Sequence, residues 1–314
     1  MTGSTERLRR DIPQTFNMYE LPREDVSIPG FLASARGSIL SHDGRSGATT
    51  LLVELPPTWV SGPTELGTAE FYVLEGGLSV EQVDVGPGGF LAVPRGGRAR
   101  VASPQGAKAV LIWEPELDAD FYYGSQPYWL RPWEQPWSVA ARPGDEPLMP
   151  GAGNGSLYKS LRPRDDNDTP LRGGPNGFLR LFTFLPGYGF PCQDVHRQSW
   201  EEVLFLTGDC LMADRGVLGP GSYVGNPRGM LHGPMVSQKG CLMLIHNSAP
   251  QGFETYDTFP DARPLVEWYL QNASLYQEPS TIPWEETMAY RAWKAMGEGE
   301  RASAFPTYLE DDPS

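Results

Sequence analysis

Short apolar runs separated by glycine and proline are the main pattern of this chain. Three examples are Phe71–Leu74, Val203–Leu206 and Leu242–Ile245, and each is too short for an ordinary helix. Turn residues such as Gly86-Pro-Gly-Gly89 and Gly219-Pro-Gly221 lie between the runs. The 36 glycines and 31 prolines supply many such turns. This pattern predicts an all-β protein of short strands.

The same pattern occurs twice, at an offset of roughly 133 residues. Glu70–Gly76 parallels Glu202–Gly208, and the turn at Pro94-Arg-Gly96 parallels Pro227-Arg-Gly229. A repeat of this length predicts a duplicated domain, and each copy can close its own antiparallel jelly roll. We therefore expect two tandem jelly-roll barrels.

Four regions follow from these patterns. We predict a first barrel at 25–117, a connection at 118–160, a second barrel at 161–255 and a C-terminal helical extension at 256–314. The connection is rich in aromatic residues, glycine and proline, and its first part, up to Trp137, is too aromatic for a free linker. We expect that part to be buried against the barrels. The extension is predicted because Pro283 follows Ser-Thr and opens a stretch with apolar residues at helical spacing.

Two motifs in the second copy carry the candidate chemistry. His196-x4-Glu201-x6-Gly208 comes first, and Gly221-x5-Pro227-x-Gly229-x2-His232 follows it. Histidine nitrogen and carboxylate oxygen suit Fe, Mn, Ni, Co or Zn, and two histidines with one carboxylate leave coordination positions open. Glu201 lies at the entry of an apolar strand, where its side chain can point into a barrel. Glu202 would take its place if the strand register were shifted by one residue.

These motifs resemble the two halves of the cupin signature, in the right order, and the duplicated chain resembles a bicupin. The sequence around Pro56-Pro-Thr-Trp59 and Phe184–Gly189 is similar to that of the cupins related to the ChrR anti-sigma factor. The resemblance implies that His196, Glu201 and His232 hold one divalent transition metal ion (Fe, Mn, Ni, Co or Zn). It is specific for the fold and weak for the reaction, because cupins carry out many reactions.

The chain departs from that signature in both copies. Asp194 stands where the signature has the first histidine of H-x-H. Its carboxylate is a fourth ligand, a group that orients a ligating histidine, or a side chain at the barrel mouth. In the first copy Ala69 and Ala99 occupy the positions of the glutamate and the last histidine, and His42 lies apart in a polar turn. We predict that the first barrel holds no metal.

Tyr223 and His246 are the candidate catalytic residues. Leu242, Leu244 and His246 share one strand face, because side chains alternate along a strand. If that face is the barrel interior, His246 reaches the metal as a base or a hydrogen-bond donor. If it is not, His246 is a core histidine whose hydrogen bonds are satisfied. Tyr223 either lines the same cavity or packs in the core.

Composition limits the partners. The net charge of −14 argues against a nucleic-acid or anionic-membrane partner. The first ten residues are polar and no stretch reaches transmembrane length, so we expect a cytoplasmic protein. Three scattered cysteines without C-x2-C spacing indicate neither a disulfide framework nor a zinc finger. A small-molecule substrate is expected, and a homodimer is one candidate assembly.

The function predicted from these features is a metal-dependent small-molecule enzyme of the cupin superfamily. An oxygenase of the dioxygenase type, using one metal ion in the second barrel, is the leading hypothesis. A non-redox isomerase, lyase or hydrolase would use the same residues. Two non-enzymatic functions also fit: a sensor or binding module without catalysis, and a bicupin whose metal ion only stabilises the fold.

Overall fold

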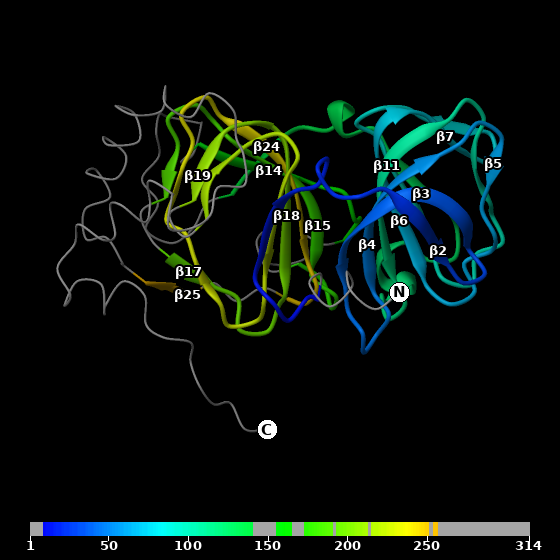
Figure 1. The fold of residues 1–314 in the computed structure, drawn as a ribbon, viewed down its shortest axis with the longest axis horizontal. Coiled ribbons are helices and arrows are strands. Elements are labelled where there is room, and N and C mark those ends of the chain that lie inside the picture. The colour runs from blue at the N-terminus through cyan, green and yellow to red at the C-terminus, as the bar shows by residue number, and fades with distance from the viewer. Residues whose placement is uncertain are drawn as a thin grey trace.

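Two jelly-roll barrels lie side by side in this computed structural model (Figure 1). The structure describes residues 9–140, 155–164, 173–190, 193–212, 215–250 and 254–256. Strands dominate these residues, which confirms the all-β prediction and the two tandem barrels. The predicted C-terminal helix lies outside the described residues. The predicted domain boundaries stay a prediction.

Each barrel is built from one large and one small antiparallel sheet. The large sheet of the first barrel has the order β12 (Tyr128–Leu130), β9 (Phe90–Val93), β6 (Thr68–Gly76), β11 (Ala107–Glu114), β4 (Thr49–Leu55), β3 (Leu32–His42) and β2 (Glu24–Ile28). Its small sheet has the order β5 (Trp59–Val60), β10 (Val101–Ser103), β7 (Leu78–Val80) and β8 (Val83–Val85).

The second barrel repeats this arrangement strand for strand. Its large sheet has the order β1 (Gln14–Asn17), β21 (Ser222–Asn226), β18 (Glu201–Gly208), β24 (Cys241–Asn247), β15 (Phe178–Phe184), β14 (Ser156–Ser160) and β13 (Ser138–Val139). Its small sheet has the order β16 (Gly189–Phe190), β23 (Met235–Val236), β19 (Cys210–Met212) and β20 (Gly216–Leu218). A further sheet has the order β22 (Leu231–His232), β17 (Gln193–Val195) and β25 (Glu254–Tyr256).

Both faces of the large sheets are buried. Phe71 and Val73 on β6 point into the first barrel, whereas Tyr72 between them belongs to an apolar layer shared by the two barrels. On β18, Val203 points into the second barrel and Leu204 into the shared layer. The large sheets therefore pack against each other through this shared layer, which is a third apolar cluster beside the two barrel interiors.

The N-terminal arm completes the second barrel, not the first. β1 pairs antiparallel with β21 at the edge of the large sheet of the second barrel, with Phe16 opposite Tyr223. The two rings are stacked, with centroids 4.7 Å apart. β12, which follows the first barrel in the chain, takes the equivalent edge position beside β9. The chain thus crosses from the second barrel to the first and back again (Figure 1).

The aromatic connection is only partly buried, which corrects the prediction for its first part. Tyr122, in the short helix α1 (Ala119–Tyr122), is buried and donates a hydrogen bond to the carbonyl of Gly177 at 2.7 Å. A 3-10 turn, η2 (Pro132–Glu134), follows. Trp129, Trp133 and Trp137 are 40%, 57% and 40% exposed. Trp129 lies on the edge strand β12, Trp133 in η2 and Trp137 just before β13 (Ser138–Val139), and none of the three rings is buried.

The described residues include no helix with the length and apolar character needed to span a membrane.

Candidate metal centre

The four predicted ligand residues meet at one end of the second barrel. Asp194 on β17 and His232 on β22 are directly opposite each other in the additional sheet. His196 follows β17, and Glu201 opens β18. All four side chains are buried, with residue exposures between 2% and 7%. Residues far apart in the sequence are therefore brought together in a dry environment.

Their donor atoms converge closely. Nε2 of His232 lies 3.0 Å from Oδ1 of Asp194 and 3.3 Å from Oε2 of Glu201. Nε2 of His196 lies 3.2 Å from Oδ1 of Asp194 and 3.4 Å from Oε1 of Glu201. Asp194, His196 and His232 each have one possible ligand atom in this cluster, and these three atoms lie within 4.8 Å of one another. Donors about 2.1 Å from a shared ion would lie about 3.0–3.4 Å apart at octahedral or tetrahedral angles.

The hydrogen bond on the far side of the His232 ring bears on the charge that the site requires. Nδ1 of His232 lies 3.3 Å from the carbonyl oxygen of Met230. A carbonyl only accepts, so the proton of a neutral His232 ring lies on Nδ1. The lone pair of Nε2 then points at two carboxylate oxygens. That contact is favourable only with a positive charge between the groups, either a proton or a metal ion.

The ionisation of the site agrees with this argument. Burial alone would lower the pKa of His232, but Asp194 and Glu201 outweigh it and raise the pKa well above its ordinary value. Burial alone would raise the pKa of Glu201, but His196 and His232 hold it well below its ordinary value. The cluster therefore stabilises an ionised carboxylate and attracts a cation.

Neighbouring groups hold the ligands in place. The side-chain amide of Asn226, opposite Glu201 on β21, donates to Oε2 of Glu201 at 3.0 Å. The N–H of Gly229 donates to the carbonyl of His196 at 3.0 Å. Gly229 has a φ of +75°, a left-handed conformation that glycine adopts easily. The tight turn before His232 thus fixes the loop that carries His196.

Tyr223 and His246 lie elsewhere. His246 is opposite Glu202 on β18, and Tyr223 is opposite Leu204, so both belong to the face turned away from the barrel interior. Neither residue therefore lies beside the metal ligands, and of the two positions considered for each the structure shows the one in the core. The physical reason is that the face shared by Leu244 and His246 is buried against the first barrel. His246 is instead a core histidine whose hydrogen bonds are satisfied.

Glu202 is the centre of this interface. Its Oε1 accepts hydrogen bonds from the hydroxyl of Thr50 at 2.6 Å and from Nδ1 of His246 at 2.9 Å. Its Oε2 accepts from the hydroxyls of Tyr223 at 2.8 Å and Ser41 at 3.2 Å. Burial opposes ionisation, but these bonds together with Arg10 lower the pKa of Glu202. Glu202 is therefore a carboxylate that joins the barrels.

Glu70 makes the reciprocal connection from the first barrel. Both of its oxygens accept hydrogen bonds from Arg162 of the second barrel at 2.7 Å, and Tyr123 donates a further short hydrogen bond. Nη2 of Arg162 also lies 3.2 Å from Nε2 of His246. Arginine only donates, so this contact places the remaining proton of His246 on Nδ1, toward Glu202. One histidine therefore links the two buried carboxylate systems.

Sequence reasoning missed these interface residues, although a signal was present. Glu70 and Glu202 occupy matching positions in the two copies. A carboxylate kept in both copies, including the one without metal ligands, has a role that metal binding does not explain. Arg10 and Arg162 carried no pattern that could have identified them.

Comparison with known proteins gives a likeness of fold. No protein-family model and no curated protein matches the sequence. Among solved structures, a candidate dioxygenase from Nostoc punctiforme is 17% identical, with 76% of this chain and 84% of that chain covered and a TM-score of 0.58. A candidate glyoxylate-induced protein from Pseudomonas aeruginosa is 14% identical, with 82% and 90% covered and a TM-score of 0.56. The protein Ylba from E. coli is 13% identical, with 78% and 94% covered and a TM-score of 0.50.

At these identities the likeness shows the fold alone, which is a pair of tandem jelly-roll barrels. The resemblance to the cupin superfamily, and to the ChrR-related cupins within it, stays a prediction.

Proposed function

We propose that the second barrel binds one divalent transition metal ion through Asp194, His196, Glu201 and His232. The observation that carries the proposal is the position of His232 Nε2, which faces two carboxylate oxygens at 3.0 and 3.3 Å. Two ionised carboxylates and two neutral imidazoles match the charge of a divalent cation. Nitrogen and oxygen donors of this kind suit Fe, Mn, Ni, Co or Zn.

We further propose that the site belongs to an enzyme acting on a small molecule, with an oxygenase as the leading reaction class. A bound ion would supply a Lewis acid and a binding position for dioxygen or a substrate oxygen. The chain's own residues prepare that position. Asn226 and the carbonyl of Met230 fix the orientation of Glu201 and His232. Apolar side chains of the barrel interior, such as Val203, limit the access of water.

A structural metal site is the second candidate, because one observation favours it. All four donor residues are buried and come from the protein, as in closed tetrahedral sites. Such an ion would fix the additional sheet of β17, β22 and β25 to the barrel. A non-redox enzyme or a binding module would use the same metal ligands, so the proposed metal site is compatible with these functions as well.

Metal analysis of full-length protein purified without added metal tests the site. We expect close to one equivalent per chain, and close to none after His196→Ala with His232→Ala. His42→Ala is the matched control, because His42 lies in the first barrel and its side chain hydrogen-bonds only to Thr49 among the described residues. Metal retained by the double variant would contradict the proposed ligands.

Nitric oxide bound to the Fe(II)-loaded protein separates the two candidate roles. It serves as a probe for dioxygen and needs an open coordination position. An electron paramagnetic resonance signal of the iron–nitrosyl complex supports the oxygenase proposal. A spectrum unchanged by nitric oxide, in protein that loses its fold when the metal is removed, favours the structural role.

A further inference from the structure

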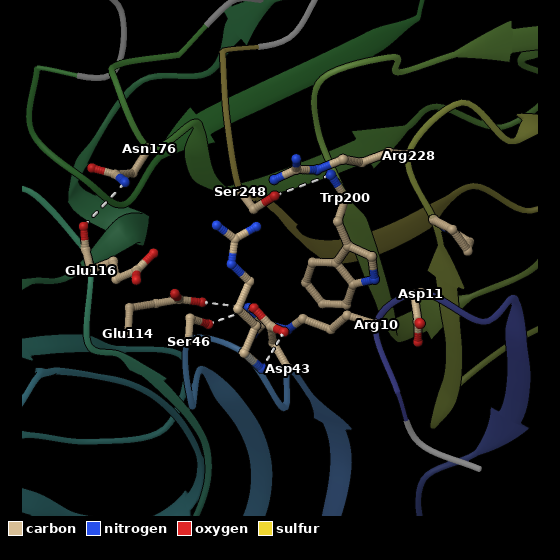
Figure 2. A pocket seen from close by; sticks show the side chains of 12 residues that line it. Arg10, Asp11, Asp43, Ser46, Glu114, Glu116, Asn176, Trp200, Arg228 and Ser248 are labelled. Carbon is tan, nitrogen blue, oxygen red and sulfur yellow. Dashed lines mark hydrogen bonds and ion pairs between the residues drawn. The ribbon is translucent and has the colours of Figure 1, made fainter. Parts of the chain in front are cut away.

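A cavity lies between the barrels, apart from the metal ligands. It has a volume of about 410 Å³, and its walls come from both barrels and from the N-terminal arm. Figure 2 shows the side chains that line it. Ligand pockets commonly have volumes of about 300–1,000 Å³ and often lie at domain interfaces. None of the four proposed metal ligands belongs to its lining.

The floor of the cavity is held by groups already bonded to each other. Nη1 of Arg10 lies 3.0 Å from Oε1 of Glu114, and these side chains are only 9% and 13% exposed. The guanidinium carbon of Arg10 lies 4.2 Å from the centre of the Trp200 ring. This ion pair and the indole form a rigid base, because each partner is fixed by the other and by burial.

Three further charged side chains on the rim are not engaged in this way. Arg45 comes from the turn between β3 and β4, Arg228 from the turn before β22, and Glu116 from the segment after β11. Within the described part of the chain, none of these three side chains forms an ion pair or a side-chain hydrogen bond. Glu116 and Arg228 lie on opposite sides of the cavity in Figure 2. The rim thus offers two cations from different barrels and, facing them, the carboxylate of Glu116. The other two rim carboxylates are engaged, Asp11 by an ion pair with Arg9 and Asp43 by a hydrogen bond from Ser46.

We propose that this cavity binds a small zwitterion of amino-acid size. Its carboxylate would be held by Arg45 and Arg228, and its ammonium group by Glu116. Hydrogen bonds between charged partners are the strong ones, and guanidinium matches carboxylate geometry. Since Arg45 and Arg228 belong to different barrels, the ligand also bridges the interface.

The test uses full-length protein and four probes. Glycine, β-alanine and γ-aminobutyrate carry both charges at increasing separation, while acetate mixed with methylammonium carries the same charges on separate molecules. We expect at least one zwitterion to bind about tenfold or more tightly than either ion of the mixture, measured by NMR titration.

Single substitutions locate the binding. Arg45→Gln and Arg228→Gln should each weaken the zwitterion about tenfold or more, and Glu116→Gln should weaken it without changing acetate binding. Arg98→Gln, an exposed arginine of the first barrel outside the cavity, is the matched control and should change nothing. Metal content and melting temperature, measured on every variant, separate binding from damage to the metal site or the fold.

Three results would overturn the inference. The first is binding of acetate as tight as that of every zwitterion, which would leave a simple anion site. The second is zwitterion binding that survives the Arg45→Gln, Arg228→Gln double substitution. The third is the absence of zwitterion binding to the native protein.

Discussion

The two barrels share one strand frame, but they end differently at the metal-binding end. The N–H of Gly96 donates to the carbonyl of Thr64 at 2.7 Å, and the N–H of Gly229 donates to that of His196 at 3.0 Å. This common bond places Thr64 at the position of His196. The other positions follow from it: Gly62, Ala69 and Ala99 stand where the second barrel has Asp194, Glu201 and His232.

The first barrel has closed this end with uncharged groups. The hydroxyl of Thr64 donates to the carbonyl of Pro94 at 2.6 Å. A Cβ atom at Gly62 would lie 1.8 Å from the carbonyl oxygen of Gly30, so no side chain fits there. Ala69 is fully buried among apolar side chains. The barrel fold therefore does not need the metal ligands. Both barrels, however, keep the carboxylate one residue further along the strand, which is Glu70 in the first barrel and Glu202 in the second.

The largest expected effect comes from placing the missing carboxylate in the first barrel. Ala69→Glu should lower the free energy of unfolding by about 5 kcal/mol or more, because a buried ion costs several kcal/mol and the new side chain also overpacks the core. Denaturant unfolding measures the loss, and Ala69→Gln separates charge from size. An Ala69→Glu protein of normal stability that binds a second metal ion would show that the first barrel retains a latent site.

The next effect concerns the carboxylate that both barrels keep. Glu70→Gln should destabilise the protein by about 3–5 kcal/mol, because it leaves Arg162 buried beside a neutral partner. Burial alone would raise the pKa of Glu70, but Arg162 holds it below its ordinary value of 4.5. The stabilisation is therefore complete above that value and is lost as the pH falls through the lower folded-state pKa.

Urea unfolding of wild type and Glu70→Gln across this pH range checks the prediction. The difference between the two proteins should be largest near neutral pH and should shrink in acid. Glu75→Gln, on the same strand but with a side chain 71% exposed, should show only a small difference at any pH. A difference that grows in acid would contradict the assignment of Glu70 as an ionised partner.

Glu201 and Glu202 give the sharpest comparison within one strand. Glu201→Gln should weaken metal binding by about tenfold to a hundredfold or more, since outer-shell changes alone have effects of that size. Glu202→Gln should leave metal affinity unchanged and cost about 1–3 kcal/mol of stability, because its hydrogen-bond donors belong to the interface. Chelator competition and thermal unfolding separate the two readouts. If Glu202→Gln weakened metal binding and Glu201→Gln did not, the register of this strand would be shifted by one residue.

The smallest effect is expected at Tyr223, whose counterpart in the first barrel is Phe90. Tyr223→Phe removes one of four hydrogen bonds to Glu202 and should cost about 1–2 kcal/mol. Metal content should not change. Combined with Glu202→Gln, the two losses should be clearly less than additive in unfolding experiments. Strict additivity would argue that the hydroxyl acts elsewhere.

The sequence was sufficient to predict the fold class and to select the residues that cluster in the second barrel. Spacing between His196, Glu201 and His232 carries that information, because turns and strand alternation fix where the side chains point. It could not show which face of β24 lies inside. Leu244 and Met243 are both buried, one between the barrels and one within, so alternation of polar and apolar residues no longer marks the interior.

Two other features also lay beyond the sequence. The pairing of β1 with β21 joins residues about two hundred positions apart, and Gln14-Thr-Phe-Asn17 has no apolar alternation to reveal it. The cavity between the barrels depends on two turns, one carrying Arg45 in the first barrel and one carrying Arg228 in the second, which meet where the barrels pack together. Such contacts follow from domain packing, and local patterns carry no record of them.

The crossing of the N-terminal arm bears on how the chain reaches its native state. During synthesis β1 emerges first, while its partner β21 is made only after the whole first barrel. Until then the arm has no place in a sheet, and contacts so distant along the chain form slowly. A second barrel expressed alone would expose the β21 edge, which favours aggregation. The duplicated halves are thus not equivalent as fragments: a cut after β12 would leave both sheets of the first barrel whole, whereas the second barrel would lose β1.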